Sequence, residues 1–282
     1  MRGEAFVRAM AEMGYIEGRN VLYTWRSANG QPDLLSQYCH ELKQGVDLIV
    51  SASTTSTHAL QEAQVRLPVV MVTVDDPVAL GFARSLSRPG YNITGVTTDA
   101  VEQAARFVEL LTQAAGKLLR VAVMANPASA TYRGYRTRIE SAAARSGTHV
   151  MVVEATSPQE IELEFPSRGP EGCDGVIVTS DTLFYSERVR LAELASGARL
   201  PVIYPQRAYV EVGGLMSYGP SPEQAYRRVA IYVDRIIKGA SPRDMAIEPP
   251  NRYELVINRA TARSLRLTLA PELLKKADKI IG

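Results

Sequence analysis

Short apolar runs rich in valine and isoleucine recur along this 282-residue chain, each followed by a helical pattern. The runs are continuously apolar instead of alternating with polar residues, which favours strands buried on both faces of a parallel sheet. Strands separated by helices in this way predict an α/β fold. The expected strands are 21–25, 47–50, 69–74, 120–124, 150–153, 176–179 and 202–204, with two later ones at 214–217 and 254–257.

The strand–helix alternation starts again near residue 98, after a segment (88–96) that carries Pro, Gly and Asn. We therefore expect two α/β lobes with parallel sheets, and 88–96 is a first crossing between them. Residues 213–218 and 249–256 are candidates for further crossings. The expected division is 1–97 plus 209–250 for the N-terminal lobe and 98–208 plus 251–282 for the C-terminal lobe.

The composition argues against several function classes. The chain has 32 basic and 30 acidic residues, a formal net charge of +2, which provides no field for nucleic acid or an anionic membrane. No stretch reaches the roughly 18 to 20 apolar residues of a membrane span. Cys39 and Cys173 fit no CxxC spacing, and the three histidines fit no zinc motif. We expect no disulfide, no metal and no cofactor.

Small polar residues follow directly after most of the expected strands. In open parallel sheets, ligands bind beyond the carboxyl ends of the strands, so these residues are candidates for ligand contact. Ser, Thr, Asn and Asp are also ordinary helix N-caps, which leaves a purely structural role open for each one. The candidate ligand-binding residues are Ser51, Ser53, Thr54, Thr55, Asp75, Asp76, Pro77, Asn126, Ser129, Asp181, Thr182, Tyr204 and Tyr218.

The segment 51–57 is the most distinctive of these, since six of its seven residues carry a hydroxyl group. Beside a helix N-terminus, hydroxyls and backbone N–H groups form a neutral pocket suited to a carboxylate. The chain contains no GxxxxGK[ST] loop and no GxGxxG loop, which argues against a nucleotide. Asp181 could pair with a ligand ammonium. Phe184, Tyr185, Tyr204 and Tyr218 could supply aromatic walls, although core packing accounts for them equally well.

A hydrolytic site built on Asp75 and Asp76 is the catalytic alternative. Adjacent residues on an extended chain point to opposite sides, so these two carboxylates are poorly placed to share a proton. Asp181 is the one further carboxylate at a strand end, and the chain has no GxSxG elbow. We therefore expect a binding protein and not an enzyme.

Five segments together resemble the ABC-transporter substrate-binding proteins of the tryptophan/tyrosine type. They are GYIEGRNVLYTWR (14–26), LKQGVDLIVSAST (42–54), LPVVMVTVDDPVALGFARSLSRPGYNITGV (67–96), YVEVGGLMSYGPS (209–221) and ARSLRLTLAPELLKKADKIIG (262–282). The resemblance implies a type I periplasmic-binding-protein fold, with two Rossmann-like lobes, a three-segment hinge and the ligand in the interlobe cleft. It also implies a monomeric, non-catalytic, periplasmic receptor that delivers an amino acid or aromatic acid to ABC permease subunits.

A ligand-sensing regulatory domain of the same fold is the alternative from a different class. Such proteins carry a DNA-binding head, and this chain has no helix-turn-helix ahead of its first lobe and no basic cluster in its place.

The resemblance also leads to an expectation about the start of the chain. Members of the family begin with an export signal and a first β-strand, and this sequence begins inside the helix that follows them. The resemblance therefore implies that a signal peptide and the first strand of the N-terminal lobe are missing from the sequence as given, either because the true start lies upstream or because this copy is truncated. We expect the reading frame to continue upstream of Met1 through both elements.

Overall fold

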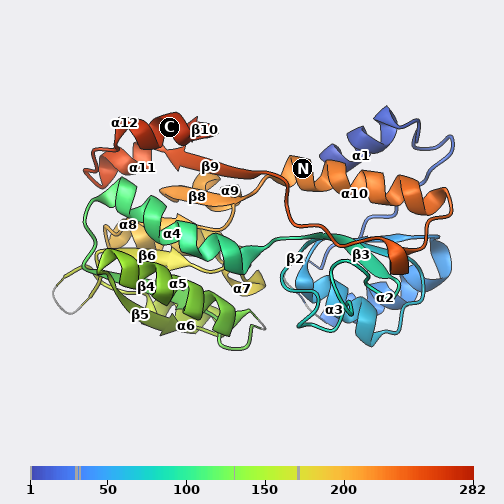
Figure 1. The fold of residues 1–282 in the computed structure, drawn as a ribbon, viewed down its shortest axis with the longest axis horizontal. Coiled ribbons are helices and arrows are strands. Elements are labelled where there is room, and N and C mark those ends of the chain that lie inside the picture. The colour runs from blue at the N-terminus through green and yellow to red at the C-terminus, as the bar shows by residue number, and fades with distance from the viewer. Residues whose placement is uncertain (1, 29–30, 32, 130, 170–171) are drawn as a thin grey trace. The chain divides into compact units, whose positions relative to one another are not determined.

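The chain divides into two compact units, which are described separately (Figure 1). The computed structural model describes residues 2–28, 31, 33–129, 131–169 and 172–282, apart from the side chains of residues 2 and 102. Unit 1 comprises Met1–Thr98 and Pro220–Arg252, and unit 2 comprises Asp99–Gly219 and Tyr253–Gly282. The chain therefore passes between the units three times, at 98/99, 219/220 and 252/253.

Unit 1 is built on a parallel three-stranded sheet of order β1-β2-β3. The strands are β1 (Ile49–Ser51), β2 (Val69–Val74) and β3 (Ile93–Thr97). The helices of the unit are α1 (Arg2–Glu12), α2 (Asp33–Gly45), α3 (Thr54–Glu62), α10 (Pro222–Ile237) and the short 3-10 helix η1 (Pro242–Asp244).

Alternate residues of β2 build two apolar clusters on the two faces of this sheet. Val70 and Val72 pack with apolar residues of α1 and α10, including Phe6 and Val229. Val69 and Met71 belong to a second cluster with residues of α2 and α3. The period-2 geometry of a strand thus explains why the run VVMVTV is apolar almost throughout.

Unit 2 holds a seven-stranded sheet of order β10-β9-β8-β7-β6-β4-β5, in which the pairs β10–β9, β8–β7, β7–β6, β6–β4 and β4–β5 are parallel. Its strands are β4 (Arg120–Ala125), β5 (His149–Glu154), β6 (Gly175–Val178), β7 (Val202–Tyr204), β8 (Met216–Pro220), β9 (Tyr253–Asn258) and β10 (Lys279–Ile281). Its helices are α4 (Ala100–Ala115), α5 (Tyr132–Ser146), α6 (Pro158–Glu164), α7 (Thr182–Ser186), α8 (Arg188–Gly197), α9 (Arg207–Glu211), α11 (Arg259–Ser264) and α12 (Pro271–Lys276).

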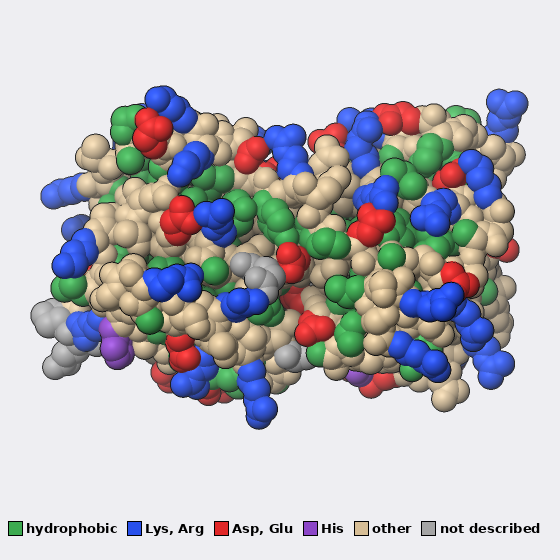
Figure 2. All heavy atoms as spheres, viewed as in Figure 1, with side chains coloured by type: hydrophobic (Ala, Val, Ile, Leu, Met, Phe, Trp, Pro, Cys, Tyr) green, Lys and Arg blue, Asp and Glu red, His purple; other side chains and the backbone are tan. Residues whose placement is uncertain are grey.

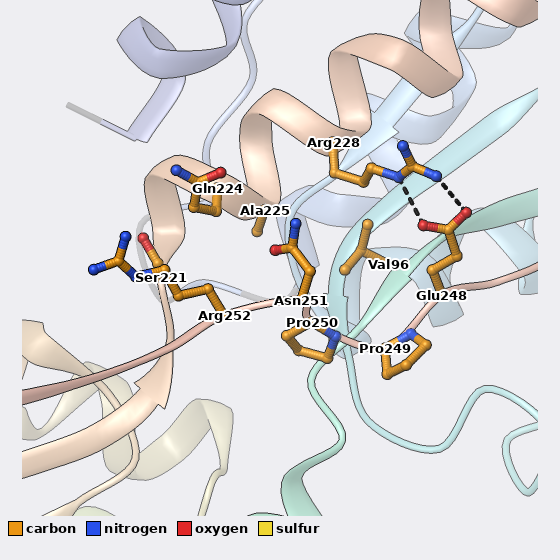
Figure 3. Close-up of a pocket in the computed structure, with 10 residues that line it drawn as sticks. All are labelled: Val96, Ser221, Gln224, Ala225, Arg228, Glu248, Pro249, Pro250, Asn251 and Arg252. Atoms are coloured by element: carbon orange, nitrogen blue, oxygen red, sulfur yellow. Dashed lines mark hydrogen bonds and ion pairs between the residues drawn. The ribbon is translucent and has the colours of Figure 1, made fainter.

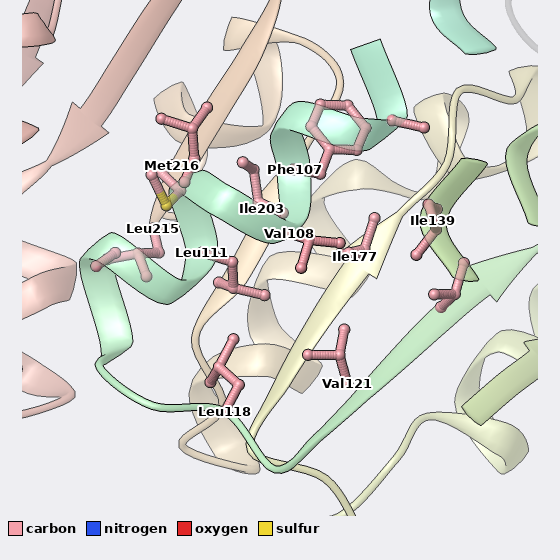
Figure 4. Close-up of a cluster of buried hydrophobic side chains, with 14 of the residues drawn as sticks. Phe107, Val108, Leu111, Leu118, Val121, Ile139, Ile177, Ile203, Leu215 and Met216 are labelled. Atoms are coloured by element: carbon pink, nitrogen blue, oxygen red, sulfur yellow. The ribbon is translucent and has the colours of Figure 1, made fainter. Parts of the chain in front are cut away.

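Two apolar clusters also form the core of unit 2. In the cluster of Figure 4, Phe107 and Leu111 of α4 pack with Ile177 of β6 and Ile203 of β7. The second cluster contains the intervening strand residues Val176 and Val178, together with residues of α7 and α8. A central parallel sheet with apolar helices on both faces is the predicted α/β architecture, which is thereby confirmed.

Two expectations about strands were wrong. The described residues 21–25 form no strand: Val21 makes an isolated bridge to Glu17, and Leu22 and Trp25 are 84% and 58% exposed. The segment 88–96, expected to be a crossing, contains most of the buried strand β3. Gly95 explains why turn-forming residues occur there: a Cβ on it would lie 2.1 Å from the backbone oxygen of Met71. Glycine in this strand therefore marks a close approach of two backbones.

The boundaries of the compact units also differ from the expected division. Residues 209–219 belong to unit 2, because β8 pairs with β7 inside the large sheet. Residues 98, 251 and 252 belong to unit 1. The backbone amide of Thr98 donates a hydrogen bond to the carbonyl of Val74, and the backbone amide of Ser221 donates one to the carbonyl of Arg252. These hydrogen bonds connect Thr98 and Arg252 to other residues of unit 1.

Candidate functional site

The predicted site residues form two groups, one at the carboxyl ends of the strands in each unit. In unit 1 they follow β1 and β2, and in unit 2 they follow β4, β6 and β7. We call them the serine–threonine group (residues 51–57 with Asp75, Asp76 and Pro77) and the Asp181 group (Asn126, Ser129, Asp181, Thr182 and their neighbours).

Much of the serine–threonine run stabilises the start of α3. Ser53 is the N-cap residue: its Oγ accepts a hydrogen bond from the amide of Ser56 at 3.1 Å, and the Ser56 Oγ accepts one from the Ser53 amide at 3.2 Å. Ser51, 3% exposed, shares a hydrogen bond with the Ser56 hydroxyl at 2.7 Å and accepts one from Thr57 at 2.8 Å. Four hydroxyls of the run are thus engaged with one another in a capping network.

Thr54 and Thr55 occupy the first two positions of α3 and are half-buried. Among the described residues, the Thr54 hydroxyl has no hydrogen-bond partner. Amides in the first turn of a helix have no intrahelical acceptor and carry the positive end of the helix dipole. This end of α3 is therefore suited to an anionic group.

The two adjacent aspartates have different roles. The Thr98 hydroxyl donates to the Asp75 carboxylate, which links the end of β2 to the last residue before a crossing. Asp76 is exposed, has a φ of +35° and accepts a hydrogen bond from the amide of Ala79 at 3.0 Å, so it caps the turn that follows. Asp commonly tolerates such left-handed backbone. Pro77, the first residue of that turn, is buried.

Asp181 and Asn126 meet at the ends of β6 and β4. The Asn126 amide donates to one oxygen of the Asp181 carboxylate at 3.2 Å, and the amide of Leu183 donates to the other at 2.8 Å, which makes Asp181 the N-cap of α7. Burial raises the pKa of Asp181, and the hydrogen bonds from Leu183 and Asn126 oppose the rise. Among the described residues no basic side chain forms an ion pair with it.

Three tyrosines pack together in unit 2, and one of them, Tyr209, is close enough to Asp181 to feel its charge. Tyr209 of α9 is fully buried, stacks on Tyr204 with ring centroids 4.7 Å apart, and makes a T-shaped contact with Tyr185 with ring centroids 6.1 Å apart. The buried Tyr209 hydroxyl has no hydrogen-bond partner among the described residues. Burial, followed by the nearby Tyr204 and Asp181, raises its pKa. A buried hydroxyl without a partner beside a carboxylate is a group that a bound ligand could satisfy.

The remaining predicted residues are distributed as follows. Tyr204 and Phe184, expected as aromatic walls, are both 0% exposed and pack in the core of unit 2, because α7, α8 and α9 cover that face of the sheet. Tyr218 is half-buried and stacks on Tyr253 at 5.5 Å. The Ser129 hydroxyl shares a hydrogen bond with that of Thr131 at 3.0 Å, and Thr182 is exposed.

Tyr209 and Arg188 were not predicted from the sequence. The guanidinium of Arg188 lies over the Tyr185 ring, 4.9 Å from its centroid. Tyr209 stands five residues beyond the end of β7, and only the turn from β7 into α9 returns its ring to Tyr204. The spacing of residues in the sequence does not predict that the Tyr209 ring stacks on Tyr204.

A separate pocket of about 270 Å³ lies wholly within unit 1 and contains none of the predicted site residues (Figure 3). Figure 2 shows basic and acidic side chains interspersed over the viewed face, without a patch of one sign. In the described part of the chain, no cluster of three His, Cys, Asp or Glu residues could hold a metal, and both cysteines are buried and free. No helix among those described is both long enough and apolar enough to cross a membrane.

Comparison with known proteins identifies the family and the fold of this chain. The family model described as ABC transporter substrate binding protein matches residues 3–281. The tyrosine-binding protein of Clostridioides difficile (strain R20291) is 24% identical over 265 residues, covering 93% of this chain and 75% of that protein. The ABC domain from Streptococcus pneumonia in complex with L-Trp has a TM-score of 0.90 at 23% identity, over 99% of this chain and 94% of the other.

The wider fold is shared with regulators. A LacI family transcriptional regulator from Bifidobacterium animalis subsp. lactis DSM 10140 has a TM-score of 0.59 at 12% identity, over 90% of this chain and 91% of the other. The expected type I periplasmic-binding-protein fold is thereby confirmed, and so is the family resemblance. The chain belongs to the ABC transporter substrate-binding protein family.

Proposed function

We propose that this protein is the extracytoplasmic receptor of an ABC importer and binds a free amino acid with an aromatic side chain. The observation that carries the proposal is the half-buried Asp181 carboxylate, which has hydrogen-bond donors but no basic partner among the described residues. A buried carboxylate without a counter-ion is costly, and the ammonium group of an amino acid would compensate it.

The carboxylate of the same ligand would bind at the start of α3. Thr54 and the first-turn amides offer hydrogen-bond donors there, and the helix dipole favours a negative charge. The capping network of Ser51, Ser53 and Ser56 would hold this end of the helix in place. The two groups of residues, one from each unit, would together make one ligand site in the interlobe cleft.

The preference for an aromatic side chain rests on the tyrosines of unit 2. Tyr185 is half-buried, with Arg188 on its face and Tyr209 in T-shaped contact, so an aromatic ring could pack there and a polar group of the ligand could satisfy the Tyr209 hydroxyl. The relatives support the same class, because one is named a tyrosine-binding protein and another was solved with L-Trp. Asp75, Asp76, Pro77 and Tyr218 are proposed as further contacts of the ligand site.

The receptor would act as a monomer that passes its ligand to the permease subunits of the transporter. A ligand screen by thermal unfolding tests the binding claim, with L-tyrosine, L-tryptophan, L-phenylalanine, branched amino acids and aromatic acids. A ligand at a hundred times its Kd adds about 2.7 kcal/mol to the free energy of unfolding. We expect the largest rise in Tm with an aromatic amino acid. If no amino acid and no aromatic acid raises the Tm, the proposal is wrong.

A further inference from the structure

The pocket in unit 1 receives wall residues from all three connections to unit 2 (Figure 3). Val96 lies two residues before the first crossing, Ser221 lies just after the second, and Arg252 is the last residue before the third. The amide of Ser221 donates to the carbonyl of Arg252 at 3.2 Å, which holds two of these segments together. The pocket is thus a fixed feature of unit 1 at the points where the chain leaves it.

Ser221 directs an unused polar group into this pocket. Only 9% of the residue is exposed, and although it occupies the N-cap position of the 16-residue helix α10, its side chain caps no amide. Within the described part of the chain its hydroxyl has no hydrogen-bond partner. Pro222, the first helical residue, has no N–H, and the next two amides of the helix lack a side-chain acceptor.

Three charged side chains, Arg228, Glu248 and Arg252, line the pocket. At one end, the Arg228 guanidinium donates two hydrogen bonds to the Glu248 carboxylate, one of them at 2.7 Å, and this contact lowers the pKa of Glu248. The acidic charge is therefore already neutralised. At the other end lie Ser221, Gln224 and the Arg252 side chain, beside the positive end of the α10 dipole (Figure 3).

We propose that this pocket binds a small oxyanion, such as sulfate, phosphate or a short carboxylate. The Ser221 hydroxyl, the amides that begin α10, the Gln224 and Asn251 side-chain amides and the Arg252 guanidinium are the donors that such an anion requires. The volume of about 270 Å³ is below the range of about 300 to 1,000 Å³ for sites of drug-sized ligands. This second site is independent of the amino-acid site proposed above.

The test is a titration of the full chain with sodium sulfate, sodium phosphate and sodium malonate, at constant ionic strength maintained with sodium chloride. Amide chemical shifts from nitrogen-15 NMR report the location, and calorimetry reports the affinity. We expect at least one of the anions to bind at a single saturable site, with shifts centred on residues 221–225 and 251–252. Saturation by malonate at the lowest concentration would identify a carboxylate site, and saturation by sulfate or phosphate an inorganic one.

Matched variants distinguish this site from a general salt effect. Ser221→Ala and Arg252→Gln should each weaken binding about tenfold or more, since each removes a donor to a charged group. Arg243→Gln removes an exposed arginine elsewhere in unit 1 and should leave the affinity unchanged. Shifts that do not saturate, shifts centred elsewhere in the wild-type protein, or equal losses for Arg252→Gln and Arg243→Gln would each overturn the proposal.

Discussion

The side-chain amide of Asn126 donates to the carboxylate of Asp181 across 3.2 Å, so residues that follow two neighbouring strands, β4 and β6, meet at one point. The same carboxylate caps α7 through the amide of Leu183. Asp181 is thereby held in one orientation while its charge lacks a basic partner among the described residues. Ligand affinity and the pH dependence of stability should both depend on this carboxylate.

Asp181→Asn should weaken the binding of an amino acid by about 2 to 5 kcal/mol, because the ligand ammonium loses its buried partner. Asparagine retains the capping oxygen, so the fold should persist. Isothermal titration calorimetry with L-tyrosine and with 3-(4-hydroxyphenyl)propionate, which lacks the amine, checks this. The substitution should hardly affect the second ligand, and equal affinity of the two proteins for L-tyrosine would show that Asp181 is only a helix cap.

The pH dependence of stability should also reveal Asp181. Burial raises its pKa in the folded protein above the usual value of 3.8, so the folded state holds this proton more tightly than the unfolded state does. Its contribution to the free energy of unfolding is therefore fully present below the unfolded pKa and is lost as the pH rises through the folded pKa. Urea denaturation of wild type and Asp181→Asn between pH 3 and pH 7 measures it. The wild type should lose stability relative to the variant across that window, and a constant difference would contradict the raised pKa.

Tyr209→Phe separates ligand binding from stability. The variant removes a buried hydroxyl that has no partner among the described residues, a group whose burial costs about 1 to 3 kcal/mol. The ligand-free variant should therefore be at least as stable as wild type, since the ring still stacks on Tyr204. If the ligand satisfies this hydroxyl, affinity should fall at the same time. Loss of stability in denaturant without loss of affinity would place the hydroxyl outside the site.

The capping network of α3 makes a prediction with a matched control. Ser53→Ala and Ser157→Ala each remove an N-cap side chain that accepts a helix amide, from α3 in unit 1 and from α6 in unit 2. Each should lower the free energy of unfolding by about 1 kcal/mol. Only Ser53→Ala should also weaken amino-acid binding, because only that cap positions the proposed carboxylate site. Equal affinities of the two variants in calorimetry would argue against a role of α3 in binding.

Gly95 should tolerate no side chain. Its φ is +134°, and a Cβ would overlap the backbone of Met71. Gly95→Ala should therefore abolish or severely weaken the folding of unit 1. Gly14 also has a positive φ, +92°, but nothing lies within 4 Å of an added Cβ, so Gly14→Ala should cost only about 1 to 2 kcal/mol. Circular dichroism during thermal unfolding distinguishes the two, and similar Tm values would contradict the close approach.

Strands buried on both faces could be predicted from the sequence, because a short, continuous run of β-branched apolar residues is typical of such strands. β2 and β7 were expected with their observed bounds, 69–74 and 202–204. β3 was not, since Asn92 and Gly95 are typical of turns and the reason for Gly95 is a contact with Met71, far away in sequence. The segment 21–25 is a short run rich in apolar and aromatic residues, as a strand is, but an exposed Leu22 and Trp25 show that composition alone does not supply a pairing partner.

The candidate site could be predicted only where it follows directly from strand ends. Asp181 and Asn126 were both identified in that way, and the structure brings them together. The sequence could not distinguish Thr54 from Ser53, because a hydroxyl that caps a helix and one that faces a ligand look the same. Tyr204 and Tyr209 show the same limit, since only the packing of α9 on β7 decides which tyrosine carries the hydroxyl without a partner.

The central claim is that one amino acid binds with its ammonium at Asp181 and its carboxylate at the start of α3. A crystal structure of the protein with L-tyrosine or L-tryptophan tests it most directly. We predict the ammonium nitrogen within about 3 Å of the Asp181 carboxylate and the ligand carboxylate at a similar distance from Thr54, as ordinary hydrogen bonds require. A ligand bound without contact to Asp181, or with its carboxylate away from α3, would contradict this claim.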